Sequence, residues 1–120
     1  MLAFAMAAAL SAAWFLVHLV MGGKQIARPL LANTSLDPIV RDTQYLCWHL
    51  TTAGIGVQAV LFALAIGLNT PAYAVAGTLL AASFAATGIA IPPAVGQRFK
   101  AMPQGWLFVP VAALGVIGLL

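Results

Sequence analysis

The placement of charge is the feature that most constrains the fold. All five lysine and arginine residues and both aspartates of the 120-residue chain fall within residues 24–42 and 98–100. The segments around them are long and mainly apolar, and the mean hydropathy of the whole chain is +1.05. Because a helix that crosses a membrane needs about 20 consecutive apolar residues, this pattern predicts an integral membrane protein built from helices.

Proline, glycine and aspartate divide the apolar runs into four segments. Asp37 and Pro38 form a helix start, since aspartate caps free backbone N–H groups and proline fits the first helical turn. Gly22-Gly23 and Pro92-Pro93 are expected to end helices. We therefore predict an all-α, polytopic membrane protein with one domain, residues 1–120. It would be a four-transmembrane-helix bundle with helices at residues 2–21, 38–68, 71–91 and 103–120.

The connection between the first two helices, residues 24–36, is too polar to cross a membrane and too apolar for a free loop. Lys24 and Arg28 can reach lipid headgroups while Ile26 turns towards the acyl chains. Pro29 argues against one unbroken helix through this part of the chain. We expect an interfacial segment that lies at the membrane surface.

The cations also predict the orientation. They lie in the first and third loops, and the turn near residue 69 has none, so the positive-inside rule places both loops in the cytoplasm and both termini in the periplasm of a bacterial inner membrane. The first helix is expected to be retained, because no cation precedes its apolar run. The cations are too few and scattered to bind nucleic acid, so we interpret them as topology determinants and lipid contacts: Lys24, Arg28, Arg41, Arg98 and Lys100.

Two histidines are the most informative polar residues. His18 and His49 are each expected a few residues inside the membrane, on antiparallel helices and at matching depth. Both imidazoles could ligate a haem b or a metal ion, or they could contact a quinone or a lipid-like ligand. Alternatively, they only hydrogen-bond neighbouring helices and no cofactor is bound.

A polar stripe accompanies these histidines. On the second helix Asp42, Tyr45, His49 and Thr52 recur at spacings of three and four, so they share one face, and Trp14 shares a face with His18. Such a stripe is typical of the outer shell of a ligated histidine, and also of a helix end fixed to its neighbour. The candidate ligand-binding residues are therefore His18, His49, Tyr45, Trp14, Thr52 and Asp42, and no catalytic residue is predicted.

Three further expectations concern packing. The third helix is rich in alanine and glycine, which favours a position enclosed by other helices. Gln58, near the middle of the second helix, needs a hydrogen-bond partner on another helix. Cys47, the only cysteine, is expected to be a small buried hydrophobe.

Two functions remain in view. The first helix has no carboxylate of the kind that small multidrug exporters need, and one cysteine excludes a thiol pair. We expect a non-enzymatic protein that contacts the lipid bilayer and binds other membrane components, as an accessory subunit or in an oligomer with itself. The alternative is a redox or ligand-binding protein that uses His18 and His49.

Overall fold

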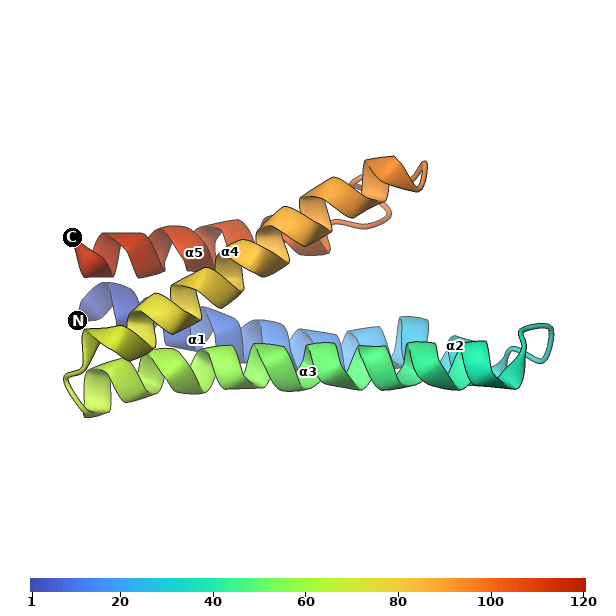
Figure 1. Ribbon diagram of the computed structural model, residues 1–120, viewed down its shortest axis with the longest axis horizontal. Helices are drawn as coiled ribbons and strands as arrows, with labels where there is room; N and C mark the ends of the chain where they lie inside the picture. Colours follow the sequence, from blue (N-terminus) through green and yellow to red (C-terminus); the bar gives the residue numbers. More distant parts are fainter.

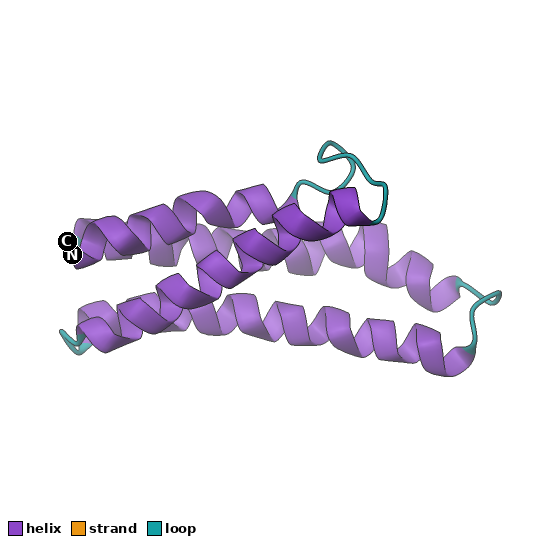
Figure 2. Cartoon of the chain, turned by 45° about the horizontal axis from the view of Figure 1, so that its top comes forward, coloured by secondary structure: helices purple, strands orange, loops and turns teal.

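The computed structural model describes residues 1–120, which form helices joined by short loops (Figure 2). Three helical stretches are long and apolar enough to cross a membrane, and these indicate a membrane protein with lipid-facing helices. A shorter apolar helix of 16 residues follows them. The elements in order are α1 (Leu2–Val17), the π-helical η1 (His18–Ala27), α2 (Arg28–Ala32), α3 (Pro38–Gly67), α4 (Pro71–Ala94) and α5 (Gln104–Leu119).

The first helix differs from the expectation. It does not end at Gly22-Gly23 but continues through η1 and α2 to Ala32, so no separate interfacial segment lies between the first two spans. The glycine pair stays helical because the Trp48 ring of α3 packs against it: a Cβ at Gly22 would lie 3.7 Å from Trp48 Nε1. Pro29 is accommodated because it stands in the first turn of α2, directly after η1 ends.

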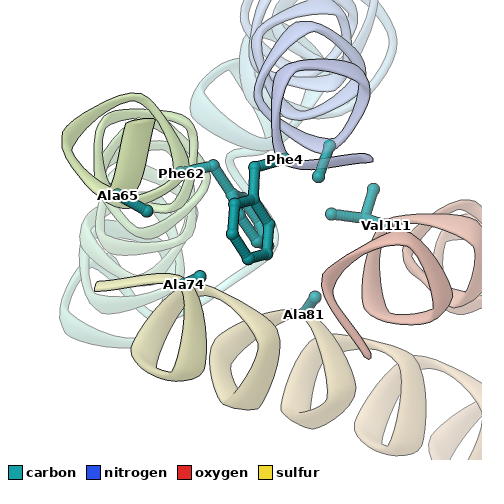
Figure 3. Close-up of a cluster of buried hydrophobic side chains, with 7 residues drawn as sticks. Phe4, Phe62, Ala65, Ala74, Ala81 and Val111 are labelled. Atoms are coloured by element: carbon teal, nitrogen blue, oxygen red, sulfur yellow. The ribbon is translucent and has the colours of Figure 1, made fainter. Parts of the chain in front are cut away.

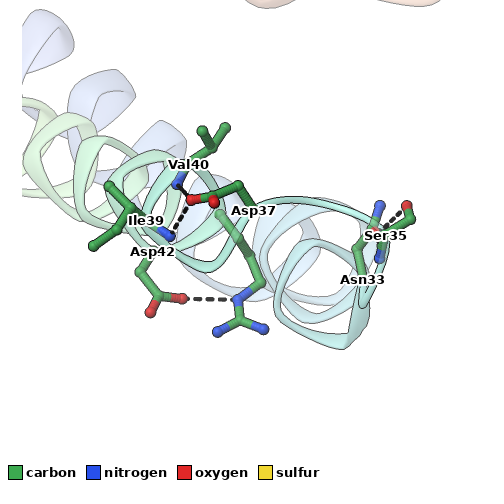
Figure 4. Close-up of polar contacts among 7 residues, drawn as sticks. Asn33, Ser35, Asp37, Ile39, Val40 and Asp42 are labelled. Atoms are coloured by element: carbon green, nitrogen blue, oxygen red, sulfur yellow. Dashed lines mark hydrogen bonds and ion pairs between the residues drawn. The ribbon is translucent and has the colours of Figure 1, made fainter.

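The predicted start of α3 is confirmed. Asp37 is its N-cap, and the carboxylate Oδ1 accepts hydrogen bonds from the backbone N–H groups of Ile39, at 2.9 Å, and Val40, at 3.4 Å (Figure 4). In the preceding loop, Asn33 Oδ1 accepts from the backbone N–H and the hydroxyl of Ser35. These local bonds stabilise the turn between α2 and α3.

The hairpin between α3 and α4 also follows the sequence. Thr70 is the N-cap of α4 and Pro71 its first residue, although the Thr70 hydroxyl donates to Leu68 O rather than capping the helix. Asn69 adopts a φ of 47°, a left-handed conformation that asparagine tolerates. The far end of α4 runs three residues past the expected residue 91, because the backbone N–H groups of Val95 and Gln97 close the last turn on Ile91 and Pro92 carbonyls.

The helices form two antiparallel hairpins that meet at one end of the molecule (Figure 1). The stretch α1–η1–α2 lies beside α3, and α5 lies beside both α4 and α1. Both chain termini and the turn at Asn69 are at this end. At the other end α4 diverges from α3, so α2 and the beginning of α3 extend beyond the α4–α5 hairpin.

The core lies where all four long helices meet. Phe4 of α1 and Phe62 of α3 stack with ring centroids 6.4 Å apart, surrounded by small side chains of α4 and by Val111 of α5 (Figure 3). Glycines let these helices approach, since Phe4 occupies the space that a Cβ at Gly118 would fill. Close packing of this kind replaces hydrophobic burial as the source of helix association inside lipid.

A close backbone contact joins Gly88 of α4 to Gly105 of α5. A Cβ added to Gly88 would lie 2.5 Å from Gly105 Cα, too near for any real side chain. The expectation that α4 is enclosed is wrong for the single chain. Only the face with Ala74, Gly77 and Ala81 is buried, because α3 and α5 pack on that side alone.

Candidate functional site

Aromatic rings from η1 and α3 gather on the hairpin that α1–η1–α2 forms with α3. The His18 ring stacks on Trp48, with centroids 4.7 Å apart and planes 18° apart. His49 meets Trp48 edge-on at 4.9 Å and Tyr45 edge-on at 4.5 Å. The two histidines therefore belong to one aromatic cluster, and Trp48 provides the ring that contacts both of them.

The local sequence positions this cluster. Tyr45, Trp48 and His49 fall at spacings of three and four on α3, which places them on one helical face. Opposite them, His18 is the first residue of η1, and Gly22 and Gly23 leave room for the indole ring. The carbonyl of Trp48 lies 3.4 Å from His18 Nε2 and accepts a hydrogen bond from the Thr52 hydroxyl at 3.0 Å.

Two predicted site residues lie elsewhere. Trp14 Nε1 donates to the carbonyl of Leu107 at 2.8 Å, so its indole faces α5 and fixes the contact between α1 and α5. Asp42 does not contact Tyr45 or His49, because its carboxylate pairs with its neighbour Arg41 at 2.7 Å (Figure 4). Asp42 is therefore not part of a hydrogen-bonded stripe with Tyr45 and His49.

The five cations divide into three groups. Lys24 and Arg28 lie on η1 and α2 and line a groove beside the aromatic cluster. Arg41 is held by Asp42. Arg98 and Lys100 stand in the exposed loop that joins α4 to α5, at residues 95–103.

The groove beside the cluster is the main candidate site. It lies between η1–α2 and α3, has a volume of about 390 Å³ and is open on one side. Its walls combine aliphatic, cationic and aromatic side chains, and none of its ten lining residues is acidic. We call it the cationic groove; its lining residues include Leu19, Val20, Lys24, Arg28, Tyr45, Trp48 and His49.

One ring nitrogen of His18 is engaged. Nε2 faces the Trp48 carbonyl and the ring is stacked on the indole, which leaves Nδ1 as the ring nitrogen without a hydrogen bond. No group of three or more histidine, cysteine or carboxylate side chains gathers anywhere in the chain in an arrangement that could hold a metal ion. Beside the cluster, the groove presents aromatic rings and cations.

A second groove lies between α3, α4 and α5, where the hairpins diverge. Its volume is about 420 Å³ and its walls carry hydroxyl and amide groups, including Thr51, Ser83, Thr87 and Gln104. The hydroxyls of Thr51 and Ser83 already donate to carbonyls one turn back in their own helices. This groove has no charged wall and adds no group with strong affinity for an ion.

Two single residues also differ from expectation. Gln58 was expected to have a hydrogen-bond partner on another helix. Its side chain is fully buried, but neither the amide oxygen nor the amide nitrogen has a hydrogen-bond partner. Cys47 is exposed on α3 rather than buried, because it lies on the side of α3 away from the other helices.

Sequence reasoning missed the role of Trp48 and of the glycine pair. No role at the site was predicted for Trp48, and Gly22-Gly23 was expected only as a helix end. Small residues in an apolar helix are a signal for the close approach of a neighbouring helix, and at Gly22-Gly23 the approaching group is the Trp48 ring. Lys24 and Arg28 were assigned to the membrane surface, and the structure brings them to one side of the same groove.

Comparisons of the chain with protein-family models, with curated proteins and with solved structures find no match.

Proposed function

We propose that the chain is a polytopic protein of the bacterial inner membrane, a four-helix transmembrane bundle that binds another membrane component in the cationic groove and catalyses no reaction. Three apolar stretches of spanning length support the first part of the proposal. The fourth crossing is α5, whose 16 residues span about 24 Å and lie along α1 with the two termini together (Figure 1).

The length of α3 supports a specific depth in the membrane. Its 30 residues span about 45 Å, which exceeds the hydrocarbon core of about 30 Å. If the turn at Asn69 lies at one membrane surface, the excess at the other surface comprises the first ten or so residues of α3. Tyr45 and Trp48 then lie at headgroup depth, where amphipathic rings are favoured, and both cationic loops face the cytoplasm.

The cationic groove is the observation that carries the function. It lies on the part of the first hairpin that the second hairpin does not cover, so it is accessible from the membrane and from its surface. Its mixture of apolar walls with a few polar and cationic groups is typical of a site that binds a ligand. The exposed outer face of α4, with Ala72, Ala76 and Ala86, additionally supports assembly with another subunit or a second copy.

Native mass spectrometry of the protein extracted from its own membranes in mild detergent tests this function. We expect the wild type to carry a bound species that is lost in Gly23→Leu, which places a larger side chain in the groove. Gly67→Leu is the matched control, because a Cβ there would meet nothing within 4 Å.

An identical set of bound species in wild type and Gly23→Leu would refute the groove as the binding site. The absorption spectrum of the same preparation addresses the alternative function. A Soret band that disappears in His18 and His49 variants would show a haem protein instead.

A further inference from the structure

We infer that the occupant of the cationic groove is one anionic phospholipid, with its phosphate between Lys24 and Arg28 and the upper part of its acyl chains along Leu19 and Val20. This inference rests on the proposed function and names the chemical class of the bound component. Four observations support it. The groove is cationic, and the carboxylates of the chain are engaged elsewhere. The groove has an apolar end and a cationic end, and the Trp48 indole N–H beside it is an unused hydrogen-bond donor.

The charge of the groove is complementary to a phosphodiester. Lys24 and Arg28 are four residues apart on consecutive helical segments, both are exposed, and both line the groove. No acidic side chain lines it. A guanidinium and an ammonium group on one wall are the two side chains that proteins use most to hold phosphate oxygens.

The carboxylates of the chain do not neutralise these cations. Asp42 is engaged by Arg41, and the only ion pair of the chain is this one. The Oδ1 oxygen of Asp37 accepts hydrogen bonds from the backbone N–H groups at the start of α3. Lys24 and Arg28 therefore remain free to pair with an external anion.

The groove is apolar at one end and cationic at the other, which matches the acyl chains and the anionic headgroup of a lipid. Leu19 and Val20 lie one to two turns closer to the hydrocarbon than Lys24 and Arg28, because α1–η1–α2 leaves the membrane in that direction. A soluble anion would gain nothing from the aliphatic end, and a neutral apolar ligand would gain nothing from the cations. An anionic amphiphile at the interface uses both.

The aromatic wall adds a hydrogen-bond donor. The side chain of Trp48 makes no hydrogen bond within the chain, because His18 and Thr52 both contact its backbone carbonyl, and this leaves the indole N–H available. Its nitrogen lies 3.7 Å from the position of a Cβ on Gly22, the residue before the groove residue Gly23. It can donate to a phosphate or ester oxygen of a lipid whose headgroup is held by the cations.

The test is a lipid titration of delipidated protein, followed by native mass spectrometry. Phosphatidylglycerol and phosphatidylcholine with identical acyl chains are compared for wild type, the double variant Lys24→Gln/Arg28→Gln and Gly23→Leu. The control is Arg98→Gln/Lys100→Gln, which removes the same charge from a loop outside the groove. Thermal melting by circular dichroism confirms that each variant is folded.

We expect wild type to bind one phosphatidylglycerol about tenfold or more tightly than phosphatidylcholine. The double variant Lys24→Gln/Arg28→Gln should weaken phosphatidylglycerol binding by about 30-fold, whereas the control Arg98→Gln/Lys100→Gln should change it by less than about threefold. Excess inorganic phosphate should not displace the lipid, because the acyl chains contribute to its binding.

Four results would overturn the inference. Equal binding of both lipids, lost in Gly23→Leu, would leave the groove as a binding site but refute its preference for an anion. Displacement of the lipid by inorganic phosphate would identify a free-anion site. Equal losses in the two double variants would show a general effect of net charge, and binding unaffected by Gly23→Leu would refute the groove and the proposed function together.

Discussion

Gln58 offers the sharpest prediction about stability. It is 0% exposed on α3, and neither polar atom of its amide has a hydrogen-bond partner. The other fully buried polar side chain, Ser11, differs because its hydroxyl donates to Ala7 O within its own helix at 2.8 Å. We predict that Gln58→Met, which keeps the length of the side chain and removes both polar groups, stabilises the protein.

The expected gain follows from two opposing effects. Each buried polar group without a partner costs about 1–3 kcal/mol in protein mutational data, so the amide could cost about twice that. In a membrane or micelle the unfolded state is also poor in water, and hydrogen bonds between transmembrane helices average only about 0.6 kcal/mol. We therefore expect Gln58→Met to raise the free energy of unfolding by about 1–3 kcal/mol.

Unfolding by sodium dodecyl sulfate in mixed micelles, followed by far-ultraviolet circular dichroism, measures this change. Gln97→Met in the exposed loop after α4 is the control, and we expect it to stay within about 0.5 kcal/mol of wild type. A loss of stability of more than about 1 kcal/mol in Gln58→Met would show that the amide is hydrogen-bonded in the folded protein, which would refute the reasoning.

Three further substitutions test individual contacts in the same assay. Gly88→Ala should destabilise the protein by about 1–3 kcal/mol, because its Cβ would collide with the Gly105 backbone, whereas Gly67→Ala should not destabilise it. His49→Gln should cost only about 1 kcal/mol, and a much larger loss together with a lost absorption band would indicate a cofactor. Asp37→Ala should cost about 1 kcal/mol by removing the N-cap of α3, and an unchanged midpoint would contradict the cap.

Local chemistry could be predicted from the sequence wherever neighbouring residues decide it. The cap at Asp37, the first-turn proline Pro38 and the turn at Asn69-Thr70 depend on a few adjacent residues, and all were placed correctly. The three helices long and apolar enough to cross a membrane also follow from apolar length. Such features need no knowledge of which helices become neighbours.

The errors arose where a distant residue decides the local structure. Gly22-Gly23 would end a helix in water, where glycine costs about 1 kcal/mol relative to alanine. Here the pair remains helical because Trp48, more than twenty residues away in sequence, packs against it. The cationic groove depends on this continuation, since Lys24 and Arg28 line it only when η1 and α2 extend the first helix.

The candidate site was predicted in part for the same reason. The stripe at Tyr45 and His49 follows from helical spacing and lies in the aromatic cluster. Trp14 and Asp42 were assigned to that site by spacing alone, but their side chains bind Leu107 and Arg41 instead. Periodicity gives the face of a helix, whereas the direction of each side chain depends on the neighbour that it meets.

The central claim is that four helices cross the membrane and present the cationic groove at its cytoplasmic surface. Labelling single cysteines with a membrane-impermeant thiol reagent in intact cells, in a Cys47→Ser background, tests it most directly. Cysteines at Leu2, Asn69 and Leu120 should react, and those at Ser35 and Gln97 should react only after the membrane is permeabilised. Protection of Asn69, or reaction of the two termini on opposite sides of the membrane, would contradict the account.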